Sequence, residues 1–165
     1  MASSSGELSP GPPGSPRLTG GPPPAPPGLS SISAMKVVVY SHDADTRAEI
    51  KLAIGRRPAP DVPEAEIVEV ATAPALFRLL EAGSVDVMML DGEAQPVGGM
   101  GISRQAKDEI YNCPPVLLVI ARADDRWLAT WSRAEAVVSH PIDPVALARE
   151  LAALMRSRAA AIAAG

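Results

Sequence analysis

Polar and titratable side chains gather in three loops of this chain, each directly after a run of apolar residues. They are Ser41, His42 and Asp43 in the first loop, Asp91 and Glu93 in the second, and His140, which precedes Pro141, in the third. Two histidines and one carboxylate could hold a transition metal as a His₂-carboxylate site. Histidines are more often ordinary polar loop residues, so we expect no metal site.

The apolar runs alternate with stretches of helical spacing. Strands are predicted at 36–40, 85–90, 116–120 and 136–138, which are apolar runs, and at 65–70, where apolar and charged residues alternate as in an edge strand. Helices are predicted before Gly55, around 75–80, at 101–110, at 127–131 and, behind the cap Asp143, at 144–155. This order predicts an α/β fold, a parallel sheet with helices on both faces. Strand carboxyl ends meet at one edge of such a sheet, so we expect the three loops to lie together.

Composition divides the 165 residues. Residues 1–34 hold 9 of the 18 prolines and 6 of the 13 glycines, so we predict a disordered tail. The proline run at 21–27 is typical of a spacer, or of a polyproline II ligand. Residues 35–157 are predicted to be one domain, and 158–165 an Ala-rich end.

Charge and cysteine usage exclude several function classes. The net charge is −4 and there is no Lys/Arg cluster, which disfavours direct nucleic-acid binding. One cysteine excludes an internal disulfide and an all-cysteine metal site. The sequence shows neither a membrane-spanning run nor a secretory signal, so we expect a cytoplasmic protein.

Four stretches carry a resemblance to a known family. They are VVVYSHDADTR at 37–47, VDVMMLDGEAQPVGGMG at 85–101, PPVLLVIARADD at 114–125 and VVSHPIDP at 137–144. Through them the chain resembles the response-regulator receiver domain. The resemblance implies the flavodoxin-like (βα)₅ fold, a doubly wound parallel sheet with strand order 2-1-3-4-5.

The resemblance assigns roles to the first two loops. Receivers accept a phosphoryl group on a carboxylate that ends the third strand, and Asp91 stands there. Two acidic residues after the first strand hold Mg²⁺ in receivers, and here they are matched by Ser41 and His42. Asp43 lies one position further on, where we expect it to cap a helix. By the same resemblance, we expect Glu93 to lie in the pocket around Asp91.

The other two family positions are also changed. A hydroxyl residue ends the fourth strand of receivers, whereas Ile120 stands here, with Ala121 next. A lysine before a proline ends the fifth strand, and its match is His140 before Pro141, a bond that is usually cis in receivers. We therefore expect weak or absent Mg²⁺ binding, no cofactor, and loss of efficient phosphorylation.

A closer likeness involves the loop at 91–101, the segment WLATWSR at 127–133 and the His-Pro pair. These are similar to an orphan receiver-like protein that accompanies bacterial respiratory complex I, the proton-pumping NADH dehydrogenase. This likeness implies docking on the peripheral arm of that enzyme, at the cytoplasmic face of the membrane.

Two of the five aromatic residues, Trp127 and Trp131, share one face of a predicted helix. Either both pack against the sheet, or at least one is an exposed partner anchor on the face of the fourth helix, fifth strand and fifth helix. Arg126 and Arg133 flank them and favour an interface.

Three functions compete. We favour a stand-alone degenerate receiver, a binding module without enzyme activity, because no output domain follows the last predicted helix. The alternative is a phosphorylatable response regulator, served by a histidine kinase at Asp91. A flavodoxin-like nucleotide-binding enzyme is less favoured: the glycines at 98–101 lack phosphate-loop spacing and indicate only a flexible helix start.

Overall fold

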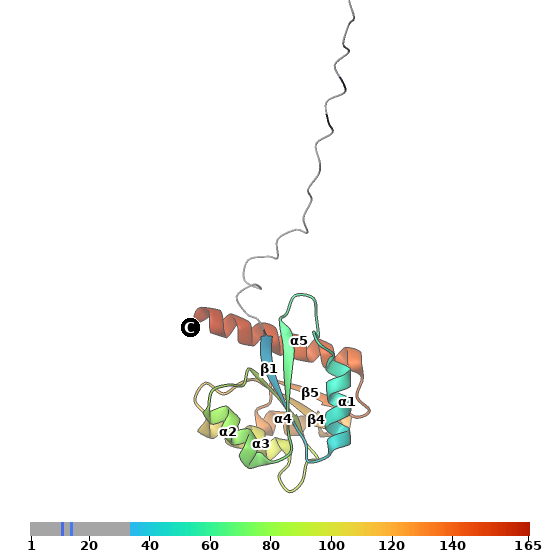
Figure 1. Ribbon diagram of the computed structural model, residues 1–165. Helices are drawn as coiled ribbons and strands as arrows, with labels where there is room; N and C mark the ends of the chain where they lie inside the picture. Colours follow the sequence, from blue (N-terminus) through green and yellow to red (C-terminus); the bar gives the residue numbers. More distant parts are fainter. Residues whose placement is uncertain (1–10, 12–13, 15–33) are drawn as a thin grey trace, which may run out of the picture.

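The computed structural model describes residues 11, 14 and 34–165, in which five parallel strands form one sheet (Figure 1). The strands are β1 (Ala34–Tyr40), β2 (Glu64–Val70), β3 (Val87–Asp91), β4 (Val116–Ile120) and β5 (Ala136–Ser139). Their order is β2-β1-β3-β4-β5, so the predicted fold and strand order are confirmed. The predicted disorder of the tail concerns residues that, Gly11, Gly14 and Ala34 apart, lie outside this described set.

Helices cover both faces of the sheet. They are α1 (Ala44–Ile54), α2 (Ala73–Glu81), α3 (Gly99–Glu109), α4 (Trp127–Ser132) and α5 (Pro144–Ala164), with a 3₁₀ turn, η1 (Ala123–Arg126), before α4. Side chains alternate across β1, so Val37 and Val39 pack with α1 and α5, whereas Val38 and Tyr40 pack with the other three helices. The sheet therefore has a core on each face.

Aspartate caps begin the two helices on one face, as predicted. Asp43 accepts a hydrogen bond from the Asp45 N–H at 2.9 Å, and Asp143 accepts one from the Val145 N–H at 2.9 Å. The Asp45 amide, with the Thr46 hydroxyl, lowers the pKa of the Asp43 carboxyl. The Asp43 carboxylate is thus turned to its helix.

The predicted end of the last helix, at residue 155, is wrong. Helix α5 continues to Ala164, because alanines favour a helix and arginines anchor it to the domain. Arg156 makes a two-pronged ion pair with Asp61 at 2.6 and 2.7 Å, and Arg158 lies 4.0 Å from Asp86. Within the described part of the chain, neither α5 nor any other helix is long and apolar enough to cross a membrane.

Candidate functional site

The loops after β1 and β3 meet at the carboxyl ends of the strands, as the parallel order predicts, whereas the loop after β5 contacts the end of β4. Asp91 is the last residue of β3, which lies between β1 and β4. Only 4% of Asp91 is exposed, so its side chain lies inside the edge of the sheet. A buried carboxylate requires hydrogen-bond donors, and the neighbouring loops supply them.

Both carboxylate oxygens of Asp91 accept a hydrogen bond from the protein. The Ser41 hydroxyl donates to Oδ2 at 2.7 Å, and the Glu93 N–H donates to Oδ1 at 2.9 Å. Ser41 is fully buried, and its Oγ also accepts from the Asp43 N–H at 3.1 Å. The Ser41 hydroxyl is therefore hydrogen-bonded directly to the buried Asp91 carboxylate.

Neighbouring elements hold Ser41 in place. Its N–H donates to the Val70 carbonyl at 3.2 Å, and Arg47 of α1 donates from Nη1 to the Ser41 carbonyl at 2.6 Å. Arg47 in turn lies 3.5 Å from Glu69 of β2. Sequence reasoning missed Arg47, because its position one helical turn after the loop gives no sign that its side chain folds back.

The end of β1 also holds the loop that follows β3. The Tyr40 hydroxyl donates to the Val97 carbonyl at 2.6 Å, and His42 Nδ1 accepts from the Gln95 N–H at 3.0 Å. Burial, and secondly the Asp91 charge, raise the pKa of Tyr40. Tyr40 was not predicted as a site residue, although a hydroxyl at the end of an apolar strand needs a partner.

Helix α3 begins directly against Asp91. A Cβ on Gly99 would lie 2.8 Å from the Asp91 carbonyl oxygen, and one on Gly98 would lie 2.7 Å from the Gly92 carbonyl oxygen. Gly98 and Gly99 therefore allow the helix start to pack closely against the end of β3, a role that the sequence did not predict. The close contact also explains why α3 begins at Gly99, earlier than predicted.

The remaining predicted pocket residues do not close around the carboxylate. Ile120 is buried in the core, Ala121 and Glu93 are exposed, and His140 is half-buried. The His140 N–H donates to the Ile120 carbonyl at 2.9 Å. Within residues 34–165 no ion pair or side-chain hydrogen bond joins His140 to Asp91. The predicted cis bond between His140 and Pro141 is present.

The predicted pocket residues do not form a metal-binding cluster in the described part of the chain. Across the described residues, no group of three or more histidine, cysteine, aspartate and glutamate side chains is placed to hold a metal ion. His42, His140 and Asp91 are therefore not assembled as a triad.

Both tryptophans of α4 are exposed. Trp127 is 68% exposed and Trp131 is 49% exposed, so the alternative that buries both is wrong. With Leu128 and with Met100 of α3 they line a groove of about 330 Å³, here called the tryptophan groove. The Arg104 guanidinium of α3 stacks 4.9 Å from the Trp131 ring centre. The tryptophan groove thus lies between α3 and α4. The prediction that the tryptophans lie on the face formed by α4, β5 and α5 is wrong.

The two flanking arginines do not line the tryptophan groove. Arg126 lines a second groove of about 190 Å³, beside Val137 of β5 and Arg149 of α5. Arg133, which ends α4 with a left-handed backbone, makes an ion pair with Asp108 of α3. The four predicted partner residues therefore do not line one groove.

Comparisons with known proteins agree with this geometry. No protein-family model matches the chain. Two proteins from two strains of Mycobacterium tuberculosis, each described as an uncharacterized response regulatory protein, are 49% identical over 129 residues. Each match covers 78% of this chain and 97% of the relative.

Solved structures at low sequence identity share the fold. The two-component transcriptional regulator AraC of Clostridium phytofermentans has a TM-score of 0.64 at 16% identity, over 79% of this chain and 99% of that chain. A CheY-like response regulator receiver domain of Methanospirillum hungatei has a TM-score of 0.59 at 16% identity, over 76% and 97%. The solved structures share the fold of this chain. The relatives at 49% identity show that the chain belongs to the response-regulator receiver family.

Proposed function

We propose that this chain is a degenerate receiver that works as a protein-binding module and has no enzyme activity. The observation that carries the proposal is the buried 2.7 Å hydrogen bond from Ser41 to Asp91. In this arrangement the phosphoacceptor position is paired with a neutral donor from the protein.

The donor set around Asp91 does not fit Mg²⁺, which prefers several oxygen ligands in octahedral geometry. The Ser41 hydroxyl points its proton at Asp91, and His42 Nδ1 accepts from the Gln95 N–H. The Asp43 carboxylate caps α1. One carboxylate therefore stands where receivers gather three, and we propose that the protein uses no metal cofactor.

The groups that would neutralise phosphoryl oxygens are also missing. Phosphoryl transfer relies on cations and hydrogen-bond donors around three charged oxygens. Ile120 has no hydroxyl, and the described contacts of His140 are made by its backbone. A phosphoryl group on Asp91 would thus lack both of its usual supports.

The tryptophan groove is the proposed docking surface. Exposed tryptophans beside arginine are typical anchors of protein interfaces. The likeness of the 91–101 and 127–133 segments to the complex I-associated protein supports the peripheral arm of respiratory complex I as partner. This would place the chain in the cytoplasm, bound to the membrane face through its partner.

The first experiment measures acyl-phosphate formation with acetyl phosphate and Mg²⁺. We expect no stoichiometric labelling of the wild-type chain, and a gain of labelling in the double variant Ser41→Asp/His42→Asp. Adding Asp91→Ala to that variant should remove the label. The alternative is a phosphorylatable regulator with a histidine kinase partner. The retained Asp91 and the relatives' description are consistent with it. Stoichiometric labelling of the wild type that disappears in Asp91→Ala would establish it instead.

The second experiment tests the partner. Tagged full-length chain is purified from native membranes as wild type, as Asp91→Ala, and as Trp127→Ala/Trp131→Ala. We expect complex I subunits to be retained by the first two and lost with the tryptophan variant, at unchanged melting temperature. Absence of respiratory subunits from the wild-type sample would refute complex I as the partner.

A further inference from the structure

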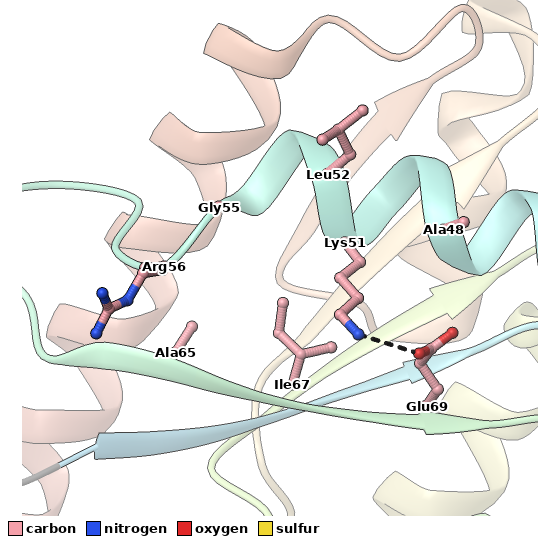
Figure 2. A pocket seen from close by; sticks show the side chains of 8 residues that line it. All are labelled: Ala48, Lys51, Leu52, Gly55, Arg56, Ala65, Ile67 and Glu69. Atoms are coloured by element: carbon pink, nitrogen blue, oxygen red, sulfur yellow. Dashed lines mark hydrogen bonds and ion pairs between the residues drawn. The ribbon is translucent and has the colours of Figure 1, made fainter.

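A groove runs between β2 and α1 at one edge of the sheet (Figure 2). Its volume is about 570 Å³, and its apolar lining comes from Ala48 and Leu52 of α1 and from Ala65 and Ile67 of β2. Leu52 is 85% exposed, which is unusual for a large apolar side chain. The groove therefore offers an apolar surface to an occupant.

Strand β2 has an open edge beside this groove, except at its amino end. The Ala65 N–H donates away from the sheet, to the Arg56 carbonyl at 2.8 Å, so the Arg56 backbone covers the edge there. Backbone groups alternate in direction along a strand, so the N–H and C=O of Ile67 also point outward. Within residues 34–165 no further strand lies beyond β2. The open edge, meaning the outward side of β2 from Ile67 onward, thus presents a backbone donor and acceptor.

The charged side chains around the groove already have partners inside the chain. Arg56 lies 3.3 Å from Glu64, and Lys51 lies 3.4 Å from Glu69. Glu69 also lies 3.5 Å from Arg47. A charged occupant would have to compete with these ion pairs, whereas an uncharged apolar segment would not. The surroundings of the groove therefore favour an uncharged occupant.

The chain carries such a segment next to the groove. Residues 18–33, directly before β1, have no charged side chain and include the proline run at 21–27. Ala34, the first residue of β1, and Ala65 of the groove lie at the amino ends of two paired strands. Gly55 lines the groove at this same end, and a Cβ on Gly55 would meet nothing within 4 Å. The tail therefore joins the domain beside an accessible end of the groove.

We propose that residues 23–27 of the same chain lie along this groove as a polyproline II helix. At about 3.1 Å per residue this helix is about 12 Å long, and β2 from Ala65 to Glu69 spans about 13 Å. One strand spacing and one residue rise put Ala34 roughly 6 Å from Ala65. The connection, residues 28–33, reaches at most about 20 Å, which is enough to pass Arg56 and enter the groove.

Proline is suited to this place by its chemistry. Its ring is apolar and its nitrogen carries no N–H, so burial against Leu52 and Ile67 leaves no donor without a partner. The polyproline II form needs no internal hydrogen bonds and is largely preformed, which lowers the entropy cost of docking. A carbonyl of the run accepts the outward Ile67 N–H. Proline cannot extend the ladder, so the occupied edge is closed to strands of other molecules.

Attachment to the same chain favours this occupant over a separate molecule. A short tether holds the proline run near the groove at a local concentration in the millimolar range. Even a weak contact is then populated, without any partner and at any protein concentration.

The first test compares amide NMR spectra of the full chain. One variant replaces the four prolines of the docked segment: Pro23→Ser, Pro24→Ser, Pro26→Ser and Pro27→Ser. We expect the amide signals of Leu52, Ala65 and Ile67 to move. The matched control replaces four prolines elsewhere in the tail and should leave these signals unchanged: Pro10→Ser, Pro12→Ser, Pro13→Ser and Pro16→Ser. Groove signals that are the same in both variants and the wild type would overturn the proposal.

The second test traps the contact and shows which chain supplies it. In a Cys113→Ser background, Ala25→Cys is combined with Leu52→Cys or, as control, with Tyr111→Cys. Tyr111 is 98% exposed and lies in the turn between α3 and β4, at the same end of the sheet as Ala34. Under mild oxidation we expect the Leu52→Cys pair to form an intramolecular disulfide at least about tenfold faster than the control pair.

Two outcomes of the crosslinking would contradict docking within one chain. Equal rates in the two pairs would show that the tail does not prefer the groove. A disulfide at Leu52→Cys found only in dimers on non-reducing gels would assign the groove to the tail of a second copy.

Discussion

Ser41 supplies the side-chain hydrogen bond to the buried Asp91 carboxylate. Two carboxylates side by side repel each other and need a cation between them. A hydroxyl at this position donates to Asp91 instead, and the buried carboxylate is stabilised without one. The Glu93 amide completes its hydrogen bonds.

Replacing Ser41 by alanine should therefore destabilise the fold. A buried hydrogen bond to a charged group contributes about 1.5–3 kcal/mol, and its loss leaves an Asp91 oxygen without its donor. Urea unfolding of Ser41→Ala should show a free-energy loss of this size. Ser139→Ala is the control, since Ser139 makes no side-chain hydrogen bond within residues 34–165. Equal stabilities of the two variants would contradict the geometry.

Tyr40 gives the domain a dependence on alkaline pH. Because burial raises its pKa above 10.0, the folded state favours the neutral phenol. Its contribution is complete below pH 10 and is lost as pH rises through the folded pKa. Tyr40→Phe should cost about 1 kcal/mol near neutral pH, through the lost bond to Val97, and should remove this alkaline loss.

Denaturation between neutral pH and about pH 11 measures the effect of Tyr40→Phe. Tyr111→Phe serves as control, because Tyr111 is 98% exposed. The same alkaline slope in wild type and Tyr40→Phe would show that Tyr40 does not titrate with folding.

At the scale of elements, the start of α3 depends on Gly99, which has no side chain. Gly99→Ala should be destabilised by roughly 1–3 kcal/mol, because its Cβ meets the Leu90 Cβ and the Asp91 carbonyl, each at 2.8 Å. Gly101→Ala, in the same helix with nothing within 4 Å, should gain about 0.5–1 kcal/mol. Thermal or urea unfolding compares them, and equal signs would disprove the packing argument.

The elements were largely predictable because their causes are local. Apolar runs identified the five strands, and Asp43 and Asp143 identified two helix starts. The end of α5 was not predictable from local pattern, since it depends on Arg156 and Asp61, which are far apart in sequence. The exposure of Trp127 was equally non-local: helical spacing gives a shared face but not the element that face meets.

Two central residues of the site were predictable, and the bonds between its residues were not. Topology brought Ser41 and Asp91 together, as their positions after β1 and at the end of β3 require. That the Ser41 hydroxyl faces the carboxylate depends on Arg47 and Val70, which hold its backbone. His140 shows the limit of this prediction: β4 lies between β3 and β5, and within residues 34–165 no side-chain hydrogen bond joins His140 to Asp91.

At the scale of the whole molecule, both tryptophans of the 165-residue sequence lie in one exposed groove. Native tryptophan emission should therefore be close to that of a solvated indole, and acrylamide should quench it strongly. Unfolding should shift the emission little, whereas binding of a partner at the groove should shift it to the blue. A native spectrum typical of buried indole, protected from acrylamide, would contradict the exposure of Trp127 and Trp131.

The three surfaces of interest lie on different elements. The Asp91 pocket is at the carboxyl ends of the strands, the tryptophan groove lies between α3 and α4, and the open edge belongs to β2 and α1. A partner in the tryptophan groove would thus leave the groove between β2 and α1 free.

The bond between Ser41 and Asp91 also bears on how such a molecule could carry information. A phosphorylated receiver reports a signal through the fraction of molecules modified, so its output can change while its copy number stays constant. If Asp91 takes no phosphoryl group, as proposed, the cell has no such modified fraction to change. Output would then follow occupancy of the partner, and the cell could adjust it only by making or degrading the protein, over generations instead of seconds.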